Sequence, residues 1–340
     1  MAFTLISGKY PPNVDPTKAP LAYGDRALPR LNRELKDTNK IVRQRAVMAL
    51  SDHIHDPEHI ATALRIGIGE TLKTCLTDKD STVRWKAVEC LCTMSAYAIG
   101  RDSFLQLETI YPVANLFDDH EDIVRKYAHT CILRISETPP GAASIVEAQL
   151  ISPLVEKLQT ELDEIKELIL DTLHFCIRVD IQSALEAGAM PVITMLLKHE
   201  LTVIRAKAAR DIMDLSVSLE GKNVAVECGT VPLLRHMLTD QSADVRAKAA
   251  GAIMTIAITT KGKYTAIHAL SIQPLTDLVD DINSEVRLNA IKALTCLAEA
   301  PEARQELTQH VIKIHNHEKD AVAAVAKAAK IAVKVITWLP

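Results

Sequence analysis

The sequence has few aromatic residues, few glycines and no long apolar run, and each shortage excludes a class of protein. Phe, Trp and Tyr make up 4% of the 340 residues, and there are 11 glycines. Frequent Ala, Leu, Lys and Glu favour helix over sheet. No apolar run reaches the roughly 18 residues of a membrane span. The N-terminus, MAFTLISGKYPP, lacks the basic and apolar regions of a signal peptide. We therefore expect an all-α chain that does not enter a membrane.

Paired cysteines and a strong net charge are also missing. The seven cysteines include no CxxC motif and fall mostly among apolar residues. This usage fits reduced thiols in an intracellular compartment better than a disulfide framework. The net charge is -4 and the pI about 6.3. Because no global positive field would attract nucleic acid, we expect no nucleic-acid partner.

What the sequence does contain is an internal repeat. Its most regular segment, called the anchor here, reads V-R-x-x-A-x-x-x-[LI]. Within it the apolar positions recur at i, i+4 and i+8, which is the spacing of one helix face. The fourth copy is degenerate and the eighth is worn. Successive copies are 41 residues apart, with two spacings of 39, and begin at residues 42, 83, 124, 165, 204, 245, 286 and 325.

Two further segments precede each anchor. An apolar segment often opens with proline, which the first helical turn tolerates, as in residues 232–238. Before it lies a short segment ending in glycine or a polar residue, as in residues 184–188. We therefore predict a short, a middle and a long third helix in each copy. The first 26 residues contain four prolines and two glycines, which predicts an extended arm rather than a helix.

These features resemble the armadillo repeat. The stretches ALEAGAMPVITMLL (184–197) and VECGTVPLLRHML (226–238) are similar to the opening of that repeat. HEAT repeats share the period and are the neighbouring possibility, but the glycine-proline opening favours armadillo. The resemblance implies a right-handed α-solenoid of about eight armadillo-type repeats over residues 27–340, preceded by the arm of residues 1–26.

An aspartate lies six residues before the anchor arginine in five copies. An aspartate in the turn before a helix can accept helix N-terminal N–H groups, and its copies would stack beside the arginines of adjacent repeats. We interpret the set as a structural ladder, with a charged ligand-binding row as the competing interpretation. The pairs are Asp37/Arg43, Asp78/Arg84, Asp119/Arg125, Asp240/Arg246 and Asp281/Arg287.

The ladder pattern fails in the fourth and fifth copies, where the pairs are Thr160/Lys166 and His199/Arg205. One shortened spacing of 39 also lies here. Our hypothesis is that residues 155–205 change the superhelix curvature or dock a partner, with simple drift of one repeat as the alternative. The acidic run in the fourth copy supplies the candidate docking residues Glu161, Asp163, Glu164 and Glu167.

Motifs for catalysis, cofactors and metals give little. No G-x-S-x-G or H-E-x-x-H motif is present, and the one G-x-G (67–69) is not followed by a phosphate-binding pattern. Two histidine clusters, at residues 53–59 and 310–317, lack cysteine support and are interpreted as solvated loops rather than metal sites. We therefore expect no enzyme activity, no cofactor and no metal.

The third helices also lack the asparagine row with which importin-type armadillo proteins hold basic peptides. That row would lie nine residues after the anchor arginine, and Trp85 stands at the start of its helix rather than one turn before the row. Nuclear import of that kind is disfavoured, although a concave groove could bind another ligand. The positions of the row hold Asp52, Thr93, Arg134, Phe175, Asp214, Thr255, Cys296 and Val335.

The arm carries four residues that could anchor it on a partner, namely Lys9, Tyr10, Lys18 and Tyr23. A merely disordered terminus is the alternative.

The arm and the array together resemble the radial spoke head 14 homologues, a family of armadillo proteins of motile cilia. The resemblance is carried by KYPPNVDPTKAPLAYGDRALPRL (9–31) and by the 41-residue period. It implies a non-catalytic scaffold subunit of the axonemal radial spoke, located in the cytoskeleton of the cilium or flagellum. Its partners would be other radial spoke proteins and, through the complex, the microtubule doublet. A soluble cytoplasmic adaptor that binds a peptide or protein in its groove is the alternative.

Overall fold

The structure, a computed structural model, describes residues 6–12 and 27–338. In these residues all regular structure is helical, and no helix is long and apolar enough to cross a membrane. The α-helices are α1 (Ala27–Glu34), α2 (Lys40–His53), α3 (Pro57–Arg65), α4 (Ile68–Cys75), α5 (Ser81–Ser95), α6 (Ala98–Gln106), α7 (Ile110–Ala114), α8 (Asp122–Ser136), α9 (Pro139–Glu147), α10 (Ile151–Thr160), α11 (Asp163–Ile177), α12 (Ile181–Glu186), α13 (Ala189–Leu196), α14 (Thr202–Leu215), α15 (Leu219–Glu227), α16 (Thr230–Met237), α17 (Ala243–Ile256), α18 (Thr260–His268), α19 (Ile272–Asp277), α20 (Ser284–Leu297), α21 (Pro301–Thr308), α22 (Val311–Asn316) and α23 (Ala323–Ile336).

The helices follow the predicted three-helix repeat. From α3 onward, each group of three consecutive helices forms one repeat, and α1 and α2 form the partial first repeat of the described chain. Three of the middle helices end in a 3-10 turn: η2 (Asn115–Asp118), η3 (Leu278–Asp280) and η4 (His317–Lys319). The prediction of an all-α repeat solenoid is therefore confirmed.

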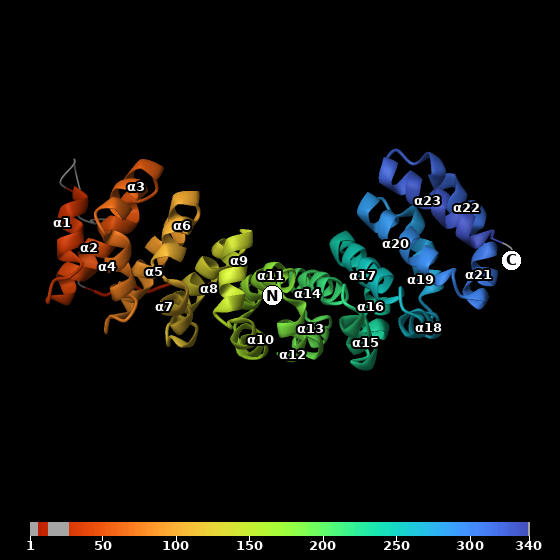
Figure 1. Cartoon of the computed structure of the whole chain (residues 1–340), viewed down its shortest axis with the longest axis horizontal. Coiled ribbons are helices and arrows are strands. Elements are labelled where there is room, and N and C mark those ends of the chain that lie inside the picture. Colours follow the sequence, from red (N-terminus) through yellow and green to blue (C-terminus); the bar gives the residue numbers. More distant parts are fainter. Residues whose placement is uncertain (1–5, 13–26, 339–340) are drawn as a thin grey trace. The chain divides into compact units, whose positions relative to one another are not determined.

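The chain divides into two compact units. Unit 1 comprises residues 1–151 and 161–179, and unit 2 comprises residues 152–160 and 180–340. Within unit 1 the third helices α2, α5, α8 and α11 pack in chain order, and within unit 2 α14, α17, α20 and α23 do the same (Figure 1). Two of the three boundaries, at residues 160/161 and 179/180, fall inside residues 155–205, where the ladder pattern fails. A change of curvature there stays a prediction.

A small residue in the middle of each third helix lets neighbouring helices approach closely. The alanine of the anchor has no exposed surface in seven copies, and the fourth copy has a fully buried isoleucine, Ile169, at this position. A longer side chain here would be forced against the neighbouring helices, because protein cores have little free volume. The seven alanines are Ala46, Ala87, Ala128, Ala208, Ala249, Ala290 and Ala329.

The turn between the first and middle helix of a repeat requires a left-handed backbone. Gly229, for example, has φ 67° immediately before α16. The same turn is made by Leu270, with φ 57° and a side chain 72% exposed. A side chain in this conformation brings Cβ close to the following carbonyl oxygen, which glycine avoids. The turn geometry is therefore retained even where the residue type opposes it. The full set is Gly67, Glu108, Gln149, Gly188, Gly229 and Leu270.

Replacing the strained leucine should stabilise the protein. We expect Leu270→Gly to raise the free energy of unfolding by about 1 kcal/mol, since the left-handed strain is relieved and little buried surface is lost. Gln309 occupies the aligned position in the last repeat but has φ −71°. Gln309→Gly is therefore the matched control and should destabilise slightly. Urea unfolding followed by circular dichroism measures both variants, and equal effects would contradict the explanation.

Candidate protein-interaction surfaces

Each anchor arginine joins its own repeat to the next one. In the second copy, Arg84 donates from Nε and Nη2 to the carboxylate of Asp119 at 2.6 and 3.0 Å. Its Nη1 donates to the main-chain carbonyl of Asp78 at 2.9 Å. The planar guanidinium suits this task because its donors form a rigid fork. One side chain therefore closes the loop of its own repeat and holds the carboxylate of the following repeat.

All ten residues of the predicted ladder take part in this pattern, and its carboxylates, that of Asp37 apart, pair with the arginine of the preceding repeat. Each arginine meets the aspartate of its own copy through a main-chain carbonyl and the next acid through its carboxylate. No anchor arginine precedes Asp37, and its carboxylate accepts the N–H of Asn39 at 2.7 Å. The ion pairs between repeats are Arg43–Asp78, Arg84–Asp119, Arg125–Glu161, Arg205–Asp240, Arg246–Asp281 and Arg287–Asp320.

Three ladder residues were missed in the sequence. The sequence places His199 where other copies have the aspartate. The Nη1 of Arg205 donates to the main-chain carbonyl of His199 at 2.8 Å, and this contact does not depend on the side chain at position 199. Asp320 stands six residues before Ala326, the worn anchor position, so its spacing was visible although its arginine was not. Glu161 was proposed for partner docking, and its carboxylate is 3% exposed against Arg125.

The ladder stabilises its carboxylates in the charged form. Burial raises the pKa of Asp119, but hydrogen bonds from Arg84 and from the N–H of Glu121 outweigh it, so the pKa is lowered. The same opposing causes lower the pKa of Asp78. The arginine side chains are only 14–19% exposed. These charges are directed at each other rather than at a partner.

Removing one ladder arginine should destabilise the array strongly. Arg84→Ala leaves the 6% exposed carboxylate of Asp119 without its cation and removes the arginine donor of two loop carbonyls. We expect a loss of about 3 kcal/mol, the typical cost of breaking one partner out of a buried pair. Arg45→Ala, on the exposed side of α2, is the control and should change stability by less than about 0.5 kcal/mol. Urea unfolding of both variants measures the difference, and a loss below 1 kcal/mol for Arg84→Ala would contradict the assignment.

The ladder also predicts a pH dependence. Because the pKa of Asp119 is lower in the folded than in the unfolded chain, the unfolded chain binds more protons near pH 4. The stabilisation is complete above the unfolded pKa of about 3.9 and is lost as the pH falls towards the folded value. We expect the difference in urea midpoint between wild type and Asp119→Asn to be large at pH 7 and to shrink below pH 4. A difference independent of pH would contradict the charged pair.

A second feature is the surface formed by positions one, five and nine residues after the anchor arginine or its equivalent, called here the third-helix surface. In unit 2 these positions supply Leu288, Lys292 and Cys296 of α20 and Lys327 and Ile331 of α23. They line a depression of about 440 Å³, completed by Met254, Ile258, Thr295, Ala324 and Ala328.

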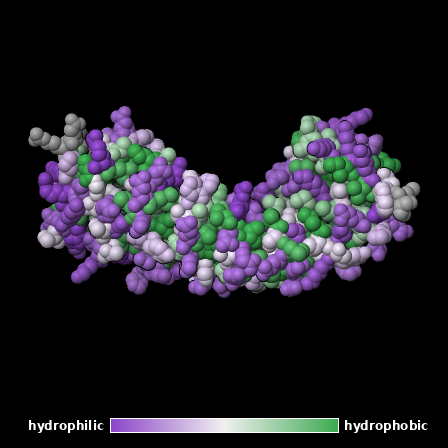
Figure 2. Space-filling view, in the orientation of Figure 1, coloured by the Kyte–Doolittle hydropathy of each residue, from purple (hydrophilic) through white to green (hydrophobic). Residues whose placement is uncertain are grey.

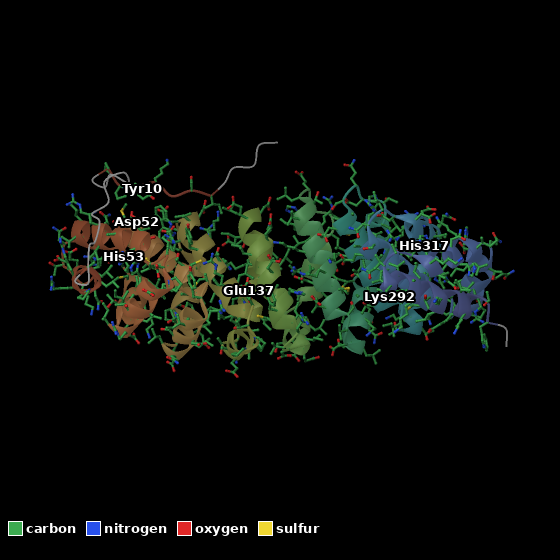
Figure 3. The ribbon with its side chains drawn as sticks, turned by 90° about the horizontal axis from the view of Figure 1, so that it is seen from above. Tyr10, Asp52, His53, Glu137, Lys292 and His317 are labelled. Atoms are coloured by element: carbon green, nitrogen blue, oxygen red, sulfur yellow. The ribbon has the colours of Figure 1, made fainter. Side chains whose placement is uncertain are left out.

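The depression in unit 2 combines apolar walls with a basic rim. Ile258 and Ile331 are 59% and 47% exposed, and hydrophobic side chains reach the surface over α20 and α23 (Figure 2). Lys292, labelled in Figure 3, and Lys327 are exposed, and neither has a carboxylate within ion-pair distance among the described residues. Exposed apolar patches with a polar rim are typical of protein-interaction sites. The charge favours an acidic ligand.

The third-helix surface of unit 1 is already occupied by the segment Ile6–Pro12. The predicted anchor Tyr10 packs on Trp85, with ring centroids 5.3 Å apart, and Lys9 is exposed beside it. Of the acidic run, Glu164 accepts the N–H of Ile6 at 3.0 Å and pairs with Lys126 at 2.7 Å. The structure therefore brings two groups of predicted docking residues together within one chain.

Of the remaining predicted docking residues, two lie on α11 and two lie outside the described residues. Asp163 lies 3.5 Å from the Nζ of Lys166 on the same helix, and Glu167 lies further along α11. Lys18 and Tyr23 fall outside the described residues.

Histidines of both clusters make contacts between neighbouring repeats. The rings of His53 and His59 stack with centroids 4.0 Å apart, and burial lowers the pKa of His53 (Figure 3). His317 contacts two carboxylates, Asp280 at 2.8 Å and Asp320 at 3.1 Å. These contacts give the histidines structural positions.

The cysteines are free thiols. Five are buried and two, Cys228 and Cys296, are partly exposed. Burial raises the pKa of Cys296 and lifts that of Cys75 to about 11. Since the thiolate is the reactive form, these thiols are poor nucleophiles.

Comparison with known proteins supports the repeat architecture. The family profile described as non-SMC mitotic condensation complex subunit 1 matches residues 67–187, and the HEAT repeat profile matches residues 230–259. An engineered protein of known structure is similar over 92% of this chain and 79% of its own, with a TM-score of 0.85 and 22% identity. A designed armadillo repeat protein in complex with the peptide (KR)4 has a TM-score of 0.61 and 23% identity over 66% of this chain and 98% of its own.

The fold and these similarities define an armadillo/HEAT-type repeat scaffold. Such solenoids expose long surfaces suited to protein–protein binding and are typically non-catalytic. The fold by itself names no partner.

Proposed function

We propose that this chain is a non-catalytic scaffold subunit of the axonemal radial spoke that binds other spoke proteins along its third-helix surface. Through the complex it would connect to the microtubule doublet of the cilium or flagellum. The assignment to the radial spoke depends on the sequence resemblance of residues 9–31 and of the 41-residue period to the radial spoke head 14 homologues.

The observation that carries the binding role is the segment Ile6–Pro12 on unit 1. It demonstrates that positions such as Trp85 accept an extended peptide segment through ring packing and a main-chain hydrogen bond. In unit 2 the corresponding positions form an apolar depression that is free of such a segment in the described residues. A scaffold that presents two such surfaces fits a subunit held between partners.

A soluble adaptor that binds a peptide is the second candidate. The designed armadillo protein in complex with the peptide (KR)4 supports it, because that protein of similar fold binds a peptide. The rim lysines Lys292 and Lys327 would repel a basic peptide, so an adaptor of this kind would take acidic ligands.

Localisation and cross-linking test the proposal. We expect the tagged chain to lie along the cilium shaft, and cross-linking mass spectrometry on isolated axonemes to join it to other radial spoke proteins. A diffuse cytosolic or nuclear pool, with no spoke protein among the cross-linked partners, would reject the spoke assignment and favour the adaptor.

The charge of the unit 2 depression gives a second test. We expect an acidic peptide with an apolar centre to bind at least tenfold more tightly than (KR)4, and the variant Lys292→Glu/Lys327→Glu to reverse this preference. Lys330→Glu/Lys334→Glu changes the net charge of the chain equally but lies outside the depression, so it is the matched control. Fluorescence anisotropy measures the affinities. Equal effects of the two variants would mean that the preference comes from the net charge of the chain and not from the depression.

A further inference from the structure

The segment Ile6–Pro12 crosses three third helices of unit 1. Tyr10 contacts Trp85 on α5, and the N–H of Ile6 reaches Glu164 on α11, so the segment passes α8 and runs opposite to the repeat order. Figure 3 shows this stretch alongside unit 1, with Tyr10 labelled. The contact is therefore made by an extended chain and not by a further helix.

Gly8 gives this contact its selectivity. Its main chain lies against the indole of Trp85, and a Cβ added at Gly8 would stand 2.7 Å from two ring carbons. That separation is well inside van der Waals contact of about 3.5 Å. Trp85 is only 7% exposed and cannot easily move aside. A larger residue at this position would therefore require the indole or the segment to shift, whereas glycine does not.

The charged part of the site is formed by residues of the third helices α5 and α8. The Nζ of Lys86 lies 4.6 Å from the ring centroid of Trp85 and 5.8 Å from that of Tyr10, within cation–π distance of both. Glu89 holds this ammonium by an ion pair of 2.5 Å and accepts the hydroxyl of Tyr127 at 2.8 Å. The ammonium of Lys86, held by Glu89, therefore lies where it can bind the face of an aromatic ring two residues after the glycine.

The segment fills this site incompletely. Tyr10 remains 38% exposed, and the buried Nε1 of Trp85 has no hydrogen-bond partner among the described residues. A buried donor left without an acceptor lowers the stability of the complex that contains it. A different ligand that places a carbonyl oxygen at Nε1 would gain what Ile6–Pro12 lacks.

We propose that the Trp85 site binds an extended segment of a partner protein in which glycine precedes an aromatic residue by two positions, and that Ile6–Pro12 occupies it in cis until the partner displaces it. Because the segment is tethered, it competes at an effective concentration in the millimolar range. The proposal deepens the scaffold function and rests on it, since it names the chemistry of one partner segment.

A reporter variant tests occupancy in the full chain. Trp338 is the second of two tryptophans and is 55% exposed. In a Trp338→Phe background, Trp85 is the only indole, and its emission reports whether the segment covers it. We expect Gly8→Val to shift the emission to longer wavelength by expelling the segment. Ser7→Val introduces the same side chain at the exposed neighbouring position and should leave the emission unchanged.

A peptide tests whether the vacated site binds in trans. The probe is a fluorescein-labelled peptide with the sequence of residues 6–12, ISGKYPP. We expect it to bind the Gly8→Val chain at least tenfold more tightly than the wild-type or Ser7→Val chain. The same peptide with alanine in place of its glycine should bind at least tenfold more weakly, which distinguishes the site from general stickiness.

Three results would overturn the proposal. An unchanged emission in Gly8→Val would mean that the segment does not depend on the glycine contact. A shifted emission without a gain in peptide binding would mean that the site only holds the chain's own segment and does not bind a partner. A wild-type mass twice that of the monomer, lost in Gly8→Val, would assign the segment to a second copy. Cross-links from unit 2 to spoke proteins would still support the proposed function in each case.

Discussion

The array depends on one interaction, the bidentate contact of each anchor arginine with an acid in the next repeat. Because the same guanidinium also binds main-chain carbonyls of its own loop, the loop geometry and the stacking of repeats are fixed together. Lysine cannot replace it, since a single ammonium has no fork of donors. At the fourth copy, Lys166 meets only the nearby Asp163 in the contacts described for it, and the division between the two compact units falls close to this copy.

The fold was predictable because its signals are local and repeated. The anchor spacing, the opening prolines and the buried alanines each report a helix face, and the structure has a helix at every such place. The ladder was only partly predictable: stacking beside arginines of adjacent repeats follows from the repeat, but the spacing does not say that the carboxylate of Asp78 pairs with Arg43, 35 residues earlier, rather than with an arginine of the following repeat. Glu161 was not recognised as a ladder acid, because in the sequence it belongs to the acidic run that continues to Glu167.

The interaction surfaces were less predictable, because they depend on residues far apart in the chain. In the sequence, Trp85 stands outside the expected row, and nothing there connects it with Gly8 and Tyr10. Only the folded chain brings these two residues into contact with its indole. The left-handed turn at Leu270 was hidden as well, since leucine is an unfavourable residue for it. Equivalent third-helix positions also differ in chemistry, with Trp85 and Glu89 in unit 1 and Leu288 and Lys292 in unit 2. One repeat plan therefore supports two surfaces of unlike selectivity.

The overlap of each arginine with the following repeat also bears on how such a gene can change length. If one whole period is duplicated or deleted, every arginine still finds an acid at the same distance along the chain. If the break falls between an arginine and its acid without restoring the period, a buried charge remains without its counterpart on one side of the junction. Recombination in such an array is therefore tolerated in steps of the 41-residue period, from which the two 39-residue spacings depart.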